Sequence, residues 1–147
     1  MSRKKPFSPE QFKLLYSQVP RLVVELVVKT QTGVVLILRK DAAWNNLWHI
    51  PGGTVFYQEY IEDAIQRIAE EELSIKVTKQ KLLGYLEYAS EEKERGFGWS
   101  VGLVFLCAAN SPLPPENQEG EQIKIFDYVP ENTVEEHQKM LSKFLSI

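Results

Sequence analysis

The chain has almost no cysteine: Cys107 is the only one among its 147 residues. A single cysteine excludes an intrachain disulfide, which is typical of proteins in a reducing compartment. Long apolar runs are also missing, because none approaches the roughly 20 residues that cross a bilayer. The basic start, Met1 to Pro6, is not followed by the apolar core of a signal peptide. We therefore expect a cytoplasmic protein with no membrane partner.

An excess of positive charge is missing too, since the formal net charge is −3. A mildly acidic chain is a poor candidate for gripping a nucleic-acid backbone, so we expect no nucleic-acid partner. A small anionic ligand stays compatible with this charge if a metal ion lies between the two. The length fits one domain, residues 1–147, in which residues 1–20 form a tail over 1–7 and a short helix. A homodimer is compatible with the sequence.

The hydrophobic patterns predict an α+β fold, with a mixed sheet between helices. Ser8 and Gln11 form a capping box with Pro9 between them, which starts a helix that should end near Pro20. The other helices are expected at about 60–73 and 133–145. The strands are expected at 22–28, 34–39, 81–88, 99–108 and 122–129. Residues 90–98 should form a polar connection, and 40–58 a long loop of the kind that is usually functional.

The helix over residues 60–73 carries an unusual pair of carboxylates. Its apolar stripe consists of Ile61, Ala64, Ile65, Ile68 and Ala69. Glu72 falls inside this stripe, where a bare charge must be paired, protonated or bound to a cation. Glu71 lies at the edge of the stripe, four residues after Arg67. The two glutamates therefore suit a hard divalent cation such as Mg²⁺.

The remaining acidic residues of this region are expected to point toward water: Glu59, Glu62, Asp63 and Glu70. A solvated charge run near a helix end is the alternative reading of residues 70–72. We accept that reading for Glu70, whereas the periodicity argues against it for Glu72.

The spacing of these residues is specific. Gly53 follows a Trp and a Pro-Gly, and five residues separate it from Glu59. Seven more residues lead to Arg67, and Glu71 and Glu72 come four and five positions later. This arrangement resembles the Nudix box: a glycine, five residues, a glutamate, seven residues, then Arg-Glu-aliphatic-any-Glu-Glu-any-Gly-aliphatic. The resemblance implies a Nudix fold and hydrolysis of a nucleoside diphosphate linked to another group.

The resemblance also implies roles for individual residues. Glu71 and Glu72 would bind Mg²⁺, or Mn²⁺ in its place, with a backbone carbonyl from Gly52 and Gly53. Arg67 would orient the glutamates, and an ion pair with Asp63 is its plainer alternative. Glu59 would be a structural member of the same network.

Two positions depart from the box. Ile68 stands where a glutamate often binds metal and acts as the base. Ser74 stands where a glycine ends the helix in the left-handed conformation, at a cost of about 1 kcal/mol.

Two residues near the long loop are candidates for substrate binding. Arg39 ends a strand at the mouth of the loop, where family members contact phosphate, although an ordinary exposed arginine fits equally well. Trp44 suits either stacking on a base or packing of the loop. The other notable side chains are expected to be structural. Trp48, Trp99 and Cys107 should lie in the core, His49 should be structural, and His137 should be exposed.

One branch of the family, the GDP-mannose mannosyl hydrolases, is similar in three further ways. Its members have an extra N-terminal helix, an aliphatic residue at the position of Ile68, and a Gln-His pair before the last strand. In that pair glutamine binds metal and histidine is the base. Here Gln118 is followed by Glu119, and histidine is absent. The resemblance implies Gln118 as a metal ligand. A carboxylate can replace the missing histidine as base, and Glu119 is our candidate, with Glu71 as the alternative. Glu119 and Glu121 fit solvated loop charges equally well.

The sequence therefore predicts a metal-dependent hydrolase of a nucleoside diphosphate derivative, for example a nucleotide sugar, in which water attacks phosphorus. Attack at the sugar carbon, as in the mannosyl hydrolase branch, is one alternative. A catalytically inactive domain that binds a nucleotide as a sensor is the other. Ile68 favours the sensor, whereas the retained pair Glu71 and Glu72 disfavours it.

Overall fold

A computed structural model describes residues 5–41 and 43–145 of the chain, so the expected tail over 1–7 lies mostly outside the described residues. The helices are α1 (Pro9–Tyr16), α2 (Ile61–Leu73), α3 (Glu91–Arg95) and α4 (Glu135–Leu145). The strands are β1 (Arg21–Lys29), β2 (Val34–Leu38), β3 (Trp48–His49), β4 (Gly52–Thr54), β5 (Val77–Glu87), β6 (Ser100–Ala109) and β7 (Ile123–Phe126). None of the helices in the described ranges has the length and apolar character that a bilayer crossing requires.

The strands form a mixed sheet with β1 at its centre. β1 runs parallel to β6, and β5 continues the sheet antiparallel to β6. On its other side β1 is antiparallel to β4 and meets β2 at Lys29 and Val34. Because β1 has neighbours on both edges and layers on both faces, Val23 to Val28 are all buried. The predicted α+β fold with a mixed sheet between helices is confirmed.

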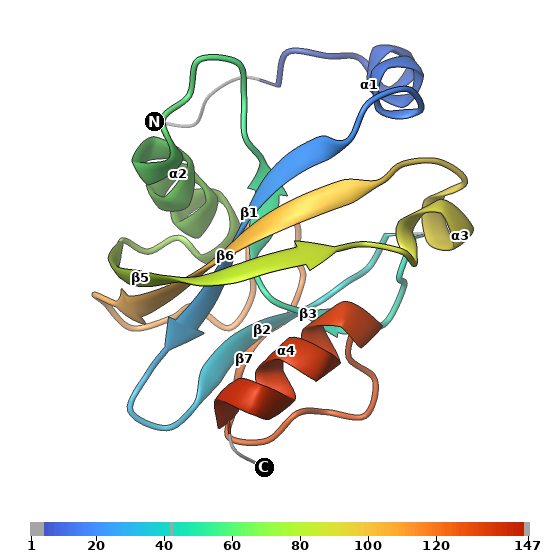
Figure 1. The fold of residues 1–147 in the computed structure, drawn as a ribbon. Helices are drawn as coiled ribbons and strands as arrows, with labels where there is room; N and C mark the ends of the chain where they lie inside the picture. The colour runs from blue at the N-terminus through green and yellow to red at the C-terminus, as the bar shows by residue number, and fades with distance from the viewer. Residues whose placement is uncertain (1–4, 42, 146–147) are drawn as a thin grey trace.

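Alternating residues of β1 divide the core into two clusters. Val24, Leu26 and Val28 pack with the apolar stripe of α2. Val27 lies in the second cluster, together with Leu141 of α4. Since consecutive side chains of a strand point to opposite faces, α2 and α4 cover opposite faces of the sheet (Figure 1). The odd-numbered residues of β1, which include Arg21 and Glu25, point toward the face covered by α4.

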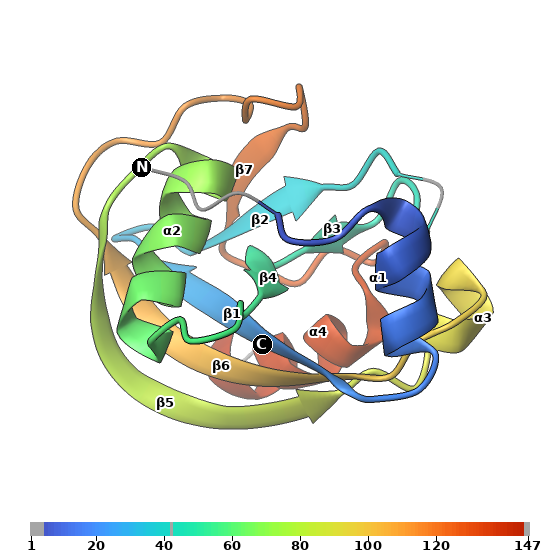
Figure 2. The ribbon, with the colours of Figure 1, turned by 90° about the horizontal axis from the view of Figure 1, so that it is seen from above.

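The N-terminal helix begins as the capping box predicts. The Gln11 amide donates to Ser8 Oγ at 3.2 Å, and the Ser8 amide donates to Gln11 Oε1 at 2.9 Å. The helix ends at Tyr16, four residues earlier than expected, because Gln18 and Val19 both donate to the carbonyl of Leu15 in a closing turn. Figure 2 shows α1 lying across the sheet on the same side of the molecule as α3, away from α2.

Several boundaries differ from the sequence prediction. β5 begins at Val77 rather than 81, because its polar, exposed first residues still pair with the end of β6 through two register shifts. The polar connection 90–98 contains α3, which Gly96 ends in a left-handed conformation. The long loop holds the short strands β3 and β4. The expected core position of Trp99 is wrong, since 45% of it is exposed just before β6 begins.

Ser74 ends α2 in the left-handed conformation that the box reserves for glycine, with φ 56° and ψ 35°. A side chain with a Cβ is strained there, whereas glycine is not. We expect Ser74→Gly to raise the free energy of unfolding by about 0.5–1 kcal/mol, since the greater freedom of glycine in the unfolded chain offsets part of the relief. Urea titration of both proteins measures the difference. An unchanged or lower midpoint would show that the serine conformation is unstrained.

Candidate active site

A cavity of about 1010 Å³ lies beside β1, and every described helix contributes to its lining. α2 supplies carboxylates to one wall, whereas α1 and α3 border the cavity at the opposite end of the molecule (Figure 2). The β4 segment, with Gly52 and Gly53, passes between them. A cavity of this size accommodates a ligand as large as a nucleotide derivative.

Glu72 lies on the α2 wall of this cavity and is partly buried. Burial, together with the negative charges of Glu121 and Glu119, raises the pKa of its carboxyl to about 7. None of the described residues donates a hydrogen bond to this carboxylate or forms an ion pair with it. The position inside the apolar stripe thus has the consequence expected from the sequence, a carboxylate whose charge requires compensation.

Arg67 is buried beneath the same wall and holds two glutamates. Its Nε and Nη2 donate to the carboxylate of Glu59 at 2.8 and 3.0 Å. Nη1 donates to Glu71 Oε2 at 3.2 Å, and Nη2 also donates to the carbonyl of Thr54 at 2.7 Å. Burial acts to lower the pKa of Arg67, but the bonds and charges of Glu59 and Glu71 outweigh it and raise the pKa. This arrangement fixes the direction of Glu71, as the resemblance implied for the arginine of the box.

Two expectations about this network are wrong. Asp63 is exposed and is not the partner of Arg67. The Glu59 side chain does not point to water, because only 2% of it is exposed. Helical periodicity does not apply to Glu59, since α2 begins at Ile61 and Glu59 instead accepts from the Phe56 amide at 3.1 Å.

The buried pair of Arg67 and Glu59 provides a stability test. We expect Glu59→Gln to lower the free energy of unfolding by about 3 kcal/mol, because it leaves a buried guanidinium with less compensation. Thermal and urea unfolding measure this loss. Asp63→Asn, which removes an exposed carboxylate from the same region, is the matched control and should change stability by less than about 0.5 kcal/mol. Equal stabilities of the two variants would refute a structural role for Glu59.

The loop between β6 and β7 brings two more carboxylates to the cavity. Glu121 is buried, and its carboxylate accepts from the Lys40 amide and from Asn117 Nδ2, each at 3.1 Å. Glu119 also lines the cavity but is exposed. Gln118 is exposed and does not line the cavity, so the structure does not bring it to Glu71 and Glu72. The reading of Glu121 as a solvated loop charge is wrong, because tertiary hydrogen bonds hold it inside.

The donors near Glu72 suit a hard divalent cation. Four carboxylates, those of Glu71, Glu72, Glu119 and Glu121, line the same cavity. Oxygen donors of this kind are the ligands that Mg²⁺ and Mn²⁺ prefer. Within the described residues no three acidic, histidine or cysteine side chains already lie close enough to hold a metal ion. One or two carboxylates with a backbone carbonyl from the Gly53 segment therefore form the donor set that fits Mg²⁺.

Gly53 is required where β4 crosses α2. A Cβ at this position would lie 3.3 Å from Ile68 Cγ1, closer than an ordinary contact. Ile68 itself is 1% exposed and belongs to the cluster between α2 and the sheet. The position that often carries a metal-binding glutamate therefore serves as a core position in this chain.

Arg39 and Trp44 both line the cavity, and the charge of Arg39 acts on Glu72. The Arg39 guanidinium donates to the carbonyl of Ala43 at 2.9 Å and forms an ion pair with Asp41 at 3.2 Å. Trp44 is buried, and its Nε1 donates to Ser90 Oγ at 3.2 Å. The indole therefore packs the loop, which was one of the two readings of this residue. Its backbone has φ 54°, a strained conformation for an aromatic residue beside a cavity.

The α4 face of the cavity holds a buried chain of polar groups. The Tyr88 hydroxyl donates to Glu25, and His137 Nε2 lies 3.1 Å from Glu25 Oε2. His137 Nδ1 accepts from the Ile50 amide at 3.2 Å, so its Nε2 carries the proton. Burial and the neighbouring Glu25 raise the pKa of Tyr88 well above its usual value. The expectation of an exposed His137 is wrong, because these contacts bury it.

His49 is buried beside this chain, as expected of a structural histidine. Its Nδ1 lies 2.8 Å from the carbonyl of Ile50 and donates to it. Burial lowers the pKa of His49 to about 3. The ring is therefore neutral, and its buried Nε2 has no hydrogen-bond partner among the described residues.

Sequence reasoning missed several residues of the cavity. Glu25 had a usable signal, because a lone glutamate within the apolar strand 22–28 must be paired when it is buried. Tyr88 and His137 had no such signal in the sequence, because they lie 63 and 112 residues away from Glu25 along the chain. Arg21, Glu91 and Arg95 likewise meet only in the folded chain.

The sequence and the fold were compared with those of known proteins. A family model of the NUDIX domain matches residues 19–145. The chain belongs to the NUDIX domain family. The earlier resemblance to Nudix hydrolases is thereby confirmed, and with it the classification of the chain as a Nudix-type enzyme.

Three relatives illustrate the match. The crystal structure of a MutT NUDIX hydrolase from Burkholderia pseudomallei has a TM-score of 0.74 and 26% identity, covering 85% of this chain and 98% of the other. An ADP-ribose pyrophosphatase from Streptococcus suis has a TM-score of 0.64 at 19% identity, covering 87% and 91% of the two chains, and shares the fold. The low-salt glycan biosynthesis protein Agl8 of Haloferax volcanii is 37% identical over 79 residues, 54% of this chain and 51% of that protein. That match spans about half of the relative.

Proposed function

We propose that the chain is a divalent-metal-dependent hydrolase of a nucleoside diphosphate linked to a sugar, with water attacking at phosphorus. The observation that carries this proposal is that the carboxylates of Glu71, Glu72, Glu119 and Glu121 line one cavity and that Arg39 lines it too, close enough for its charge to act on Glu72. A metal ion would compensate the carboxylates, and a diphosphate would bind between the metal ion and Arg39. The 37% identity to a protein named for glycan biosynthesis favours a sugar as the linked group, because glycans are built from activated sugars.

Metal binding, positioning of a metal ligand and phosphate binding are assigned to different residues of the cavity. Glu71 and Glu72 would hold Mg²⁺ or Mn²⁺ with a carbonyl of the Gly52–Gly53 segment. The bound ion would offset the diphosphate charge and stabilise the leaving group. Arg67 keeps Glu71 in place through its bond at 3.2 Å. Arg39, which lines the same cavity, offers a guanidinium suited to phosphate oxygens.

The proton acceptor is the part of the site that the Nudix box does not supply, because Ile68 is apolar and buried. Glu119 is exposed at the cavity and carries no hydrogen bond on its carboxylate from a described residue, so it is free to accept a proton from water. Glu121 is held by two hydrogen bonds and is better suited to a fixed position near Glu72. We assign Glu119 as the general base.

A substrate panel tests the proposal. Nucleotide sugars, dinucleotides, ADP-ribose and nucleoside triphosphates are incubated with Mg²⁺ or Mn²⁺, and the products are identified by mass. We expect a nucleotide sugar to give a nucleoside monophosphate and a sugar phosphate. Hydrolysis in ¹⁸O water should label a phosphate. Label on the sugar would instead assign attack at carbon, as in the mannosyl hydrolases.

Nucleotide binding without any product would support the sensor alternative and contradict the proposal. The assays are therefore accompanied by calorimetry of the same compounds with the same metals. The retained glutamate pair and the carboxylates of the 116–121 loop favour turnover, since a nucleotide sensor needs no acidic wall.

A further inference from the structure

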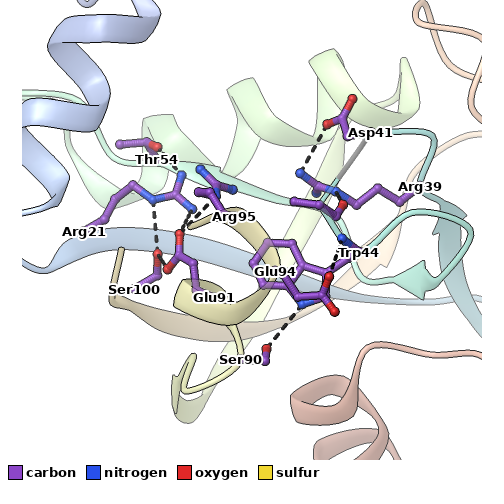
Figure 3. Close-up of polar contacts among 11 residues, drawn as sticks. Arg21, Arg39, Asp41, Trp44, Thr54, Ser90, Glu91, Glu94, Arg95 and Ser100 are labelled. Atoms are coloured by element: carbon purple, nitrogen blue, oxygen red, sulfur yellow. Dashed lines mark hydrogen bonds and ion pairs between the residues drawn. The ribbon is translucent and has the colours of Figure 1, made fainter. Parts of the chain in front are cut away.

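Three arginines line the cavity at the end bordered by α1 and α3, and we call Arg21, Arg39 and Arg95 the arginine cluster (Figure 3). Arg21 begins β1, Arg39 follows β2, and Arg95 ends α3. None of them belongs to the Nudix box. The carboxylates assigned to the metal site, those of Glu71, Glu72, Glu119 and Glu121, line the same cavity on or near α2.

One buried carboxylate serves two of these arginines. Glu91 is 1% exposed and accepts from Ser100 Oγ at 2.6 Å. Its Oε2 lies 3.4 Å from Arg21 Nη2 and 3.4 Å from Arg95 Nε. Glu91 is thus shared between two guanidinium groups, and Glu25 also acts on Arg21.

Glu91 is built into the fold at this position. Gly98, with φ 107°, packs so closely that a Cβ there would lie 3.0 Å from Glu91 Oε2. Arg21 is fixed as well, because it donates to Ser100 Oγ at 3.1 Å and to Thr54 Oγ1 at 2.9 Å. Arg21 and Glu91 therefore hold fixed positions, and Arg95 lies against Glu91.

Arg95 has unused hydrogen-bonding capacity. Its guanidinium makes no hydrogen bond with any described residue, and its buried Nε forms only the ion pair with Glu91 Oε2 at 3.4 Å. The rings of Phe12, Trp44 and Phe97 surround it, with centroids 5.7 to 5.8 Å from Cζ. Aromatic faces stabilise a cation but accept none of its five N–H groups in regular hydrogen bonds.

Charges of both signs surround Arg95. Burial lowers its pKa to about 10, and Arg21 and Arg39 lower it, whereas Glu91 and Asp41 act in the opposite direction. Asp41 is 64% exposed, so solvent screens its contribution. Glu94 turns toward the backbone amide of Trp44, at 3.3 Å. An anion in the cavity would meet the donors of Arg95 and offset the repulsion among the three arginines.

We propose that Arg95, with Arg21 beside it, forms a subsite for a carboxylate on the group joined to the diphosphate, which makes an acidic sugar nucleotide the preferred ligand. Arg39, the third member of the arginine cluster, acts on Glu72 and stays with the diphosphate, as in the proposed function. The orientation of the ligand rests on the proposed function, which puts the diphosphate at the α2 wall. The linked group then extends toward α1 and α3. A planar carboxylate matches the fork of an arginine better than the hydroxymethyl group of a neutral sugar.

Matched pairs of ligands test the subsite by binding alone. UDP-glucuronate is compared with UDP-glucose, and GDP-mannuronate with GDP-mannose, so that each pair differs mainly in the carboxylate. Affinities are measured by calorimetry in EDTA, where metal-assisted turnover is absent, and again with Mg²⁺ at low temperature. We expect the acidic member of at least one pair to bind about tenfold or more tightly, as expected for a charge-assisted bond.

Two variants assign the preference to Arg95. Arg95→Met should bring the ratio of the two affinities close to one, and Arg95→Lys, which keeps the charge without the fork, should keep part of the preference. Lys93→Met is the matched control, because it removes an exposed positive charge from the same helix and should leave the ratio unchanged. Thermal melting verifies that each variant is folded.

The outcomes separate this inference from the proposed function. Equal binding of both members to the unmodified protein would overturn the subsite, and so would undetectable binding of the acidic members at millimolar concentration with and without Mg²⁺. Equal weakening of both members by Arg95→Met would show that the cluster holds the diphosphate or the base instead. A chain that hydrolyses nothing but keeps the preference would refute the hydrolase and support the subsite.

Discussion

Glu72→Gln should lower kcat by about 10³-fold or more while the protein stays folded. The metal ion supplies several kcal/mol of charge stabilisation, and each 1.36 kcal/mol is about tenfold in rate. Glu72 has no described cation partner in the chain itself, and its pKa is raised to about 7 by burial and by neighbouring carboxylates. A neutral amide of the same size therefore relieves repulsion. At pH 8 without metal we expect an unchanged or higher melting temperature.

A second measurement separates metal binding from other roles of Glu72. Mg²⁺ should raise the melting temperature of the unmodified protein, since a ligand bound only by the folded state stabilises it, but should not raise that of Glu72→Gln. Glu70→Gln is the matched control, because Glu70 is exposed two residues earlier in α2. Near-normal turnover of Glu72→Gln at saturating Mg²⁺ would remove Glu72 from the metal site.

Glu119→Gln should lower kcat by about 10²-fold or more with little change in KM, as expected when a general base is lost. The substitution keeps the size of the side chain and removes the proton acceptor. Glu119 is exposed at the cavity on the loop before β7, where it can approach a water molecule beside the substrate. The effect should be the same with Mg²⁺ and Mn²⁺, because the base is distinct from the metal ligands.

Two further variants of the loop make this result specific. Glu116→Gln removes an exposed carboxylate of the same loop that does not line the cavity, and should leave kcat unchanged. Glu121→Gln should act differently, by raising the metal concentration needed for half-maximal rate, because Glu121 is buried and is the carboxylate with the largest influence on Glu72. A normal kcat for Glu119→Gln on a good substrate would assign the base elsewhere, with Glu71 as the next candidate.

Local order along the chain was predictable wherever it depends on neighbours in the sequence. The capping box of Ser8 and Gln11, the left-handed end of α2 at Ser74, and the buried stripe with Glu72 at its border all follow from contacts within a few residues. The apolar face of α2 selects its own position on the sheet, since burying that face is the main contribution to stability. The spacing from Gly53 to Glu72 predicted the family on the same basis.

The misplaced residues share a different cause. Glu59 lies just outside α2, so helical periodicity gave it the wrong direction. His137 is on a helix whose sequence allows an exposed histidine, but a partner 112 residues away buries it. Glu121 looks like any loop carboxylate until Lys40, from the other end of the chain, donates to it.

The sequence by itself determined the secondary structure that carries the box, the family, and the pair of carboxylates on α2. Only the tertiary structure decided what faces that pair across the cavity. Arg21 and Glu91 are 70 residues apart, and no local pattern records that one buried carboxylate would serve two arginines. Such contacts form because the sheet brings the start of β1 beside α3, and burial then requires each charge to find a partner there.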